Sequence, residues 1–142
     1  MKIKKKYYGT TSAGEEVTLY ILTNSNGVSL EIITYGGIIT KLFFPDNKGI
    51  LGNIVLGYDN LKDYEENQPF FGGIIGRYAN RIKDGIFKID NIKVNIDKNN
   101  GNNHLHGGFS GFHKKVWKAK SIKRKDSLSI ILNYISKDLE GG

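Results

Sequence analysis

Cysteine and long apolar runs are both absent from this chain of 142 residues. Without cysteine the chain can form neither a disulfide framework nor a thiolate metal site. No stretch approaches the roughly 18 consecutive apolar residues that a membrane-spanning helix needs. The charged segment at residues 1–6 is not followed by an apolar run, so it lacks the core of a secretory signal. We therefore expect a cytoplasmic protein that does not bind a membrane.

Proline and arginine are also scarce. Only 2 prolines accompany 18 glycines, a ratio that favours many turns over a disordered linker. The net charge of +7 comes almost entirely from lysine, because Arg77, Arg81 and Arg124 are the only arginines. The lysines are spread along the chain and often alternate with apolar residues, as on solvent-exposed faces and edges of sheets. We expect no nucleic-acid partner, although a basic nucleic-acid-binding β-domain is an alternative.

Apolar residues recur at every second position through most of the chain, which predicts an all-β fold. Residues 23–27 form a turn with Asn-Gly between two such stretches, which is typical of a hairpin. Residues 61–66 could form one helical turn. No composition shift marks a boundary, so residues 1–142 are expected to belong to a single domain. The predicted strands are residues 16–22, 28–32, 38–44, 53–57, 85–89, 92–96, 116–122 and 128–135.

The last predicted strand runs into a segment with turn chemistry, residues 136–142. A turn normally leads to a partner strand, and an unpaired strand exposes open hydrogen-bonding groups. This pattern suggests a truncated chain with an incomplete sheet.

A first group of candidate site residues lies in residues 70–82, which contain two of the three arginines. Asn80 offers a hydrogen-bond donor and an acceptor, and Arg81 offers five fixed donors. Together they suit a neutral polyhydroxylated ligand. The alternative is that Arg77 and Arg81 only make ion pairs at the surface.

A second group centres on His106, which precedes Gly107 and Gly108. The glycines permit close backbone approach and unusual φ angles. The imidazole can exchange hydrogen bonds with a sugar hydroxyl or transfer a proton near neutral pH. His104 would point to the opposite face of an extended segment, so we expect no metal site and assign His104 a supporting role in the loop. His113 is expected to be an ordinary exposed loop residue.

Two motifs resemble those of the aldose 1-epimerase (galactose mutarotase) family. Gly76-Arg77-Tyr78-Ala79-Asn80-Arg81-Ile82 is similar to the family motif GRxANRI, and Leu105-His106-Gly107-Gly108 is similar to LHGG. The resemblance implies a galactose mutarotase-like supersandwich, which is an antiparallel β-sandwich and is incomplete in this chain. It also implies interconversion of the α and β anomers of an aldohexose such as galactose or glucose, with no metal and no cofactor.

The resemblance assigns roles residue by residue. Asn80 and Arg81 match substrate-binding positions, and His106 matches the first active-site histidine, which holds the sugar near its ring oxygen. Arg77 is left with a structural role. The alternatives are a non-catalytic carbohydrate-binding domain and a mutarotase-like protein for hexose 6-phosphates, which would need a cationic pocket.

The principal proton-transfer residues of the family lie outside the match. The proton-donating histidine and the catalytic glutamate are expected beyond residue 142, and Glu140 matches a glycine-rich loop rather than the base. We therefore expect residues 1–142 to be an N-terminal portion that is inactive alone, and that self-associates or needs a missing C-terminal part.

Overall fold

The computed structural model describes residues 1–66 and 69–141. It contains many short antiparallel strands and little helix, which confirms the predicted all-β class. The elements in chain order are β1 (Lys2–Thr10), β2 (Glu16–Thr23), β3 (Ser29–Ile33), β4 (Ile39–Pro45), β5 (Leu51–Asn53), α1 (Leu61–Glu65), β6 (Arg81–Ile82), η1 (Lys83–Gly85), β7 (Ile86–Ile89), β8 (Ile92–Asn95), β9 (His104–Leu105), η2 (Gly108–Ser110), η3 (Phe112–Lys114), β10 (Lys118–Lys123) and β11 (Leu128–Asn133).

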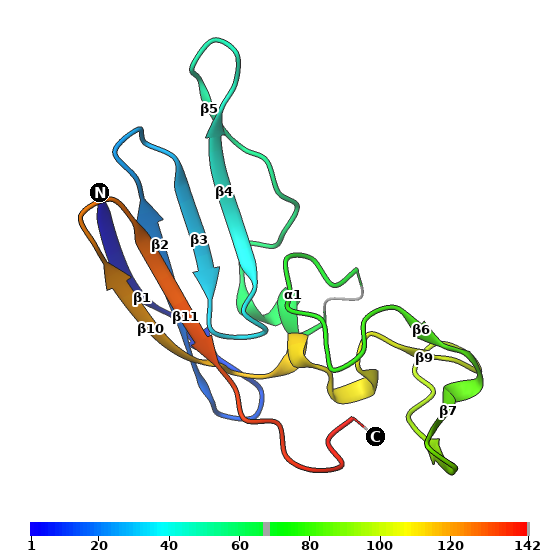
Figure 1. The fold of residues 1–142 in the computed structure, drawn as a ribbon. Coiled ribbons are helices and arrows are strands. Elements are labelled where there is room, and N and C mark those ends of the chain that lie inside the picture. The colour runs from blue at the N-terminus through cyan, green and yellow to red at the C-terminus, as the bar shows by residue number, and fades with distance from the viewer. Residues whose placement is uncertain (67–68, 142) are drawn as a thin grey trace.

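The main sheet is a meander in which β1 to β5 pair in sequence order, each antiparallel to the next (Figure 1). The predicted hairpin joins β2 and β3, with Leu22 opposite Leu30 and Tyr20 opposite Ile32. The side chain of Asn24 closes its turn by accepting from the backbone N–H groups of Asn26 and Val28. An asparagine that bonds its own turn in this way stabilises the reversal of the chain.

A second layer, the β10–β11 hairpin, lies across one face of the main sheet (Figure 1). Its apolar side chains pack on a buried group from β2 and β3 formed by Tyr20, Leu22 and Ile32. Residues spaced by two along a strand point to one face, so alternation along β2 supplies this group. The two layers make a small β-sandwich.

The opposite face of the main sheet carries a second core. Val17, Leu19 and Ile33 from β2 and β3 pack against Leu61 and Tyr64 of α1. The side chain of Asn60 accepts a hydrogen bond from the backbone N–H of Asp63, a typical N-cap that starts this short helix. The helical turn predicted at residues 61–66 is thus confirmed.

Two small sheets lie beside the sandwich. β6 pairs with β9, and β7 pairs with β8 in the hairpin predicted from residues 85–96. Figure 1 shows them at the lower right of the molecule, near the end of the chain. They carry the segments that the motifs single out.

Two strand predictions are wrong at the N-terminal half. Residues 53–57 are not a buried strand, because β5 ends at Asn53 and Leu56 is 72% exposed. The side chain of Asn53 hydrogen-bonds the backbone of Leu42 and Val55, so it takes over groups that a strand ladder would use. In addition, β1 was not predicted, since its run of lysines shows no apolar alternation.

No helix in the described part of the chain is long and apolar enough to cross a membrane.

Candidate functional site

The two motif segments meet in the structure through the pairing of β6 with β9. Arg81 lies opposite Leu105, and Ile82 lies opposite His104. The residues just before β6 and just after β9 are therefore neighbours, although 26 positions separate Asn80 from His106. The structure thus brings together Asn80, Arg81 and His106, the three residues expected in the site.

Asn80 and His106 bind each other through two hydrogen bonds, here called the Asn80–His106 pair. The backbone N–H of His106 donates to the carbonyl oxygen of Asn80 at 3.1 Å. The backbone N–H of Asn80 donates to Nδ1 of the His106 ring at 2.9 Å. A backbone N–H can only donate, so Nδ1 must accept, and the neutral ring carries its proton on Nε2. The pair fixes both the position and the tautomer of the imidazole.

Arg81 is held by carboxamides. Its Nε donates to Oδ1 of Asn100 at 3.0 Å, and its Nη1 lies 3.5 Å from Oδ1 of Asn80. The side chain also lines a cavity of about 600 Å³ together with Arg77, Tyr78 and the chain near Gly141. No carboxylate pairs with Arg81 among the described residues. The surface ion-pair alternative for this arginine therefore has no support in the described part of the chain.

The asparagine-rich loop between β8 and β9 supports the site. The carboxamide of Asn99 donates to the carbonyl of Leu105 at 2.8 Å and accepts from its N–H at 2.7 Å. His104 is buried, with its Nδ1 3.0 Å from the carbonyl oxygen of Asp97. The expected supporting role of His104 fits this geometry, and no group of three metal-binding side chains occurs among the described residues.

Glycines let the two segments approach closely. A Cβ on Gly107 would lie 1.8 Å from the carbonyl oxygen of Gly76, and one on Gly111 would lie 2.6 Å from that of His106. Gly107 also has a φ of +89°, a region that side-chain-bearing residues avoid. The close approach expected for the glycines after His106 is therefore confirmed.

Three of the six non-glycine residues with a positive φ in the described part of the chain lie here. Asn80 and His106 have φ angles of 67° and 53°, and Phe70 has a φ of 61°. Non-glycine residues rarely adopt this conformation, and such strain occurs preferentially at functional sites. The ring of Phe70 packs edge to face on His106, with centroids 4.9 Å apart. Phe70 was not among the expected site residues, and only its position at the start of the first motif segment could have suggested it.

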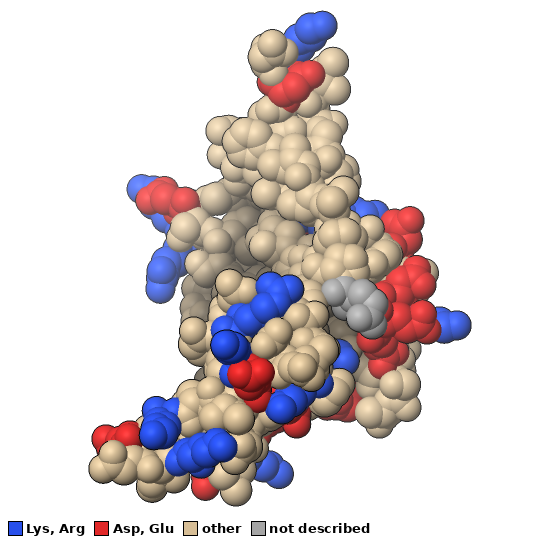
Figure 2. All heavy atoms as spheres, turned by 90° about the vertical axis from the view of Figure 1, so that its right-hand side faces the viewer, with Lys and Arg blue, Asp and Glu red and all other residues tan. Residues whose placement is uncertain are grey.

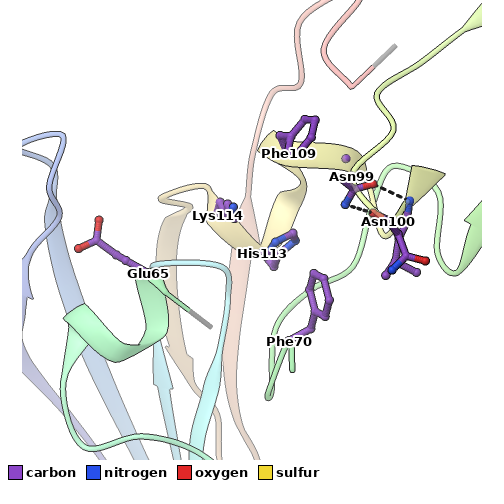
Figure 3. A pocket seen from close by; sticks show the side chains of 9 residues that line it. Glu65, Phe70, Asn99, Asn100, Phe109, His113 and Lys114 are labelled. Atoms are coloured by element: carbon purple, nitrogen blue, oxygen red, sulfur yellow. Dashed lines mark hydrogen bonds between the residues drawn. The ribbon is translucent and has the colours of Figure 1, made fainter. Parts of the chain in front are cut away.

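The expectation for His113 is wrong. It is 4% exposed and lies in the wall of a cavity of about 280 Å³, between Lys114 and Phe70 (Figure 3). Three glycines from separate segments make room for it, since a Cβ on Gly36, Gly73 or Gly111 would stand within 3.1 Å of a His113 atom. Burial, with smaller effects from Lys114 and His106, lowers the pKa of His113 to about 4.

Arg77 lines the cavity of about 600 Å³ and also hydrogen-bonds the C-terminal segment. Its Nε and Nη2 donate to Oγ of Ser136 at 3.0 and 2.8 Å, and Nη2 also donates to the carbonyl of Lys137. These contacts agree with the structural role expected for Arg77. That Asn80, Arg81 and His106 bind a sugar stays a prediction.

The buried imidazole of His113 predicts a pH-dependent stability. Its folded pKa of about 4 lies below the ordinary 6.5, so the unfolded chain binds the proton more readily. The stabilisation is complete above about pH 6.5 and is lost as the pH falls towards 4, by up to about 3 kcal/mol. Urea unfolding of wild type and His113→Phe between pH 7 and pH 4 should show a steeper decline for wild type. Equal slopes would contradict this assignment.

Comparisons with known proteins agree with the motifs. Residues 18–141 match the family model described as aldose 1-epimerase. Galactose mutarotase from Bos taurus is 33% identical over 142 residues, and that from Homo sapiens is 34% identical over 140 residues. These alignments cover 100% and 99% of this chain and 40% of each relative.

A solved structure gives the same result. Galactose 1-epimerase from Lactobacillus acidophilus NCFM superimposes with a TM-score of 0.84 and 25% identity, over 99% of this chain and 40% of that chain. The chain thus spans about 40% of the length of these relatives. Because the family model matches most of its length and the fold agrees, the chain belongs to the aldose 1-epimerase family.

Proposed function

We propose that the protein acts in aldose 1-epimerisation, and that residues 1–142 supply the part that grips the sugar. The substrate is an aldohexose such as galactose or glucose, and the setting is cytoplasmic hexose metabolism. The Asn80–His106 pair, with Arg81 beside it, is the observation that carries this proposal. It presents a fixed imidazole close to a guanidinium, and neither group pairs with a carboxylate among the residues that the structure describes.

The geometry suits a neutral sugar. Anomer interconversion opens the pyranose ring, so a base must take the anomeric hydroxyl proton while an acid protonates the ring oxygen. With Nδ1 occupied by Asn80, His106 has a single N–H left, at Nε2, and can donate it to a sugar oxygen. Arg81 adds donors that cannot lose their protons. Both residues therefore hold and orient sugar oxygens.

The carboxylate of Glu140 is poorly suited to be the missing base. It accepts hydrogen bonds from Tyr134, Ser136 and Lys115. The hydrogen bonds from Lys115, Ser136 and Tyr134 lower its pKa to about 2. A base so weak and so fully bonded removes a hydroxyl proton inefficiently near neutral pH. We propose that turnover needs an acid and a base that these 142 residues do not contain.

The proposal predicts sugar binding without turnover. Wild-type protein should show saturable shifts in its NMR spectrum on addition of D-galactose, and Arg81→Ala should weaken binding by about tenfold or more, as expected for a lost charge-assisted hydrogen bond. Arg124→Ala removes an arginine from the β10–β11 turn and should leave the affinity unchanged.

Polarimetry with fresh α-D-galactose tests the second half of that prediction. General acid and base catalysis typically contributes about 10²–10⁴-fold to a rate. The rate of mutarotation should therefore stay close to the spontaneous one. Clear acceleration of mutarotation by the pure chain would contradict the prediction that it does not turn over sugar. An absence of galactose binding would contradict the proposed function as a whole.

We further propose that an exposed apolar surface of this chain becomes buried against other polypeptide, either a second copy of the chain or a further part of the family fold. β11 pairs only with β10 in the described part of the chain, so its other edge is open. Ile131 on β11 is 50% exposed, and Ile135 and Leu139 beyond it are 80% and 79% exposed. Open edges with apolar side chains favour association.

Sedimentation velocity provides the test. Wild type should form concentration-dependent oligomers, and Ile131→Lys should reduce them because a charge on an edge strand disfavours pairing. A compact monomer at every concentration would contradict self-association.

A further inference from the structure

A network of polar side chains links the C-terminal segment to the first motif segment, and its centre is Glu140. Oε1 of Glu140 lies 2.6 Å from the hydroxyl of Tyr134 and 2.7 Å from Nζ of Lys115. Oε2 lies 2.5 Å from Oγ of Ser136. The carboxylate side chain is only 17% exposed, so its partners are largely protein groups. Bonds of this kind, with a charged acceptor, are stronger than neutral ones.

The protons and lone pairs available on Arg77, Ser136 and Glu140 fix the direction of the hydrogen bonds that join them. Arg77 can only donate, so Ser136 Oγ accepts from its Nε and Nη2 with both lone pairs. The single hydroxyl proton of Ser136 must then go to Glu140, which as a carboxylate can only accept. Arg77 therefore donates to Ser136, and Ser136 donates to Glu140. The Ser136 hydroxyl has no proton or lone pair left for another partner.

This network acts on the segment that carries the site residues. Residues 77–80 are exposed and lie outside the helices and strands, between the buried Gly76 and β6. The side chain of Arg77 ties this segment to Ser136. At the other end of the network, a Cβ on Gly141 would lie 3.6 Å from the carbonyl oxygen of Gly107, next to His106. Arg77, Arg81 and Gly141 line one cavity of about 600 Å³.

We propose that Glu140 is a positioning residue for the sugar site, because it orients the Ser136 hydroxyl that holds Arg77 and, through it, residues 77–80. The inference rests on the proposed function, since it concerns the geometry of the same site. Glu140 touches no sugar in this account. It fixes the backbone from which Asn80 reaches His106.

An isosteric change exposes the role of the charge. In Glu140→Gln, one orientation of the amide points its NH₂ at Ser136, which then faces a third donor with only two lone pairs. The other orientation points the NH₂ at Lys115 and Tyr134, both of which donate to Glu140 in wild type. The first orientation frustrates the Ser136–Arg77 contact directly. The second opposes the ammonium of Lys115 and so weakens the anchoring of residue 140, which orients the Ser136 hydroxyl, although the shape of the side chain is kept. Ser136→Ala breaks the same contact without any change of charge.

The test is the affinity for D-galactose, measured by NMR titration under conditions where urea unfolding shows each variant to be fully folded. Glu140→Gln and Ser136→Ala should each weaken binding by about tenfold, because small misplacements of binding groups are costly. The double variant should be no weaker than either single one, since both break one linear chain of contacts. Ser136→Thr keeps the hydroxyl and should restore wild-type affinity. Glu16→Gln, an exposed carboxylate on β2, is the matched control and should bind as wild type does.

The outcomes separate this inference from the proposed function. If folded Glu140→Gln and Ser136→Ala bind galactose as tightly as wild type, or if their effects simply add, the positioning role is wrong while the sugar site stands. If wild type does not bind galactose, the proposed function fails first. A role confined to overall stability would shift the urea midpoint and leave the affinity of the folded protein unchanged.

Discussion

The two hydrogen bonds of the Asn80–His106 pair are the contact on which the candidate site depends. Through them a backbone amide on one segment and an imidazole on another, 26 positions apart, determine each other's place. Both residues adopt left-handed backbone conformations that are costly for side chains with a Cβ. Two such conformations at one contact persist only when the surrounding structure holds the contact in place.

Neighbouring strands and side chains hold the Asn80–His106 pair in place. Pairing of β6 with β9 aligns the two segments, and Gly76 and Gly107 let their backbones meet without an intervening Cβ. The carboxamide of Asn99 saturates the backbone of Leu105, one residue before His106. The connection between β3 and β4 holds the chain on either side of these segments, because Ile74 donates to the carbonyl of Gly36 and Trp117 donates to that of Thr34.

Much of this could be predicted from the sequence where the information is local. Alternation located β2, β3, β4 and the β7–β8 hairpin, and the two motifs singled out the segments of the candidate site. β1 was missed because a lysine-rich edge strand exposed on most of its length has no apolar alternation to reveal it. The strand predicted at residues 53–57 was wrong because the sequence of an apolar run does not show which groups hydrogen-bond its backbone. Here the side chain of Asn53 hydrogen-bonds the backbone of Val55.

The burial of His113 could not be predicted, since it depends on distant parts of the chain. Gly36 and Gly73 come from other segments, and only the folded arrangement shows that they leave space for the backbone and Cβ of His113. The same holds for the network around Glu140, whose members lie between residues 77 and 140. Sequence placed Arg77 in a structural role, and the structure identifies Ser136 as its partner.

The tautomer of His106 tests the central claim most directly. A long-range ¹H–¹⁵N correlation spectrum of the ligand-free protein at neutral pH distinguishes a protonated ring nitrogen from an unprotonated one. We predict an unprotonated Nδ1, which accepts from Asn80, and a proton on Nε2 that is available to a sugar oxygen. A ring that carries its proton on Nδ1 would contradict the Asn80–His106 pair and the site built on it.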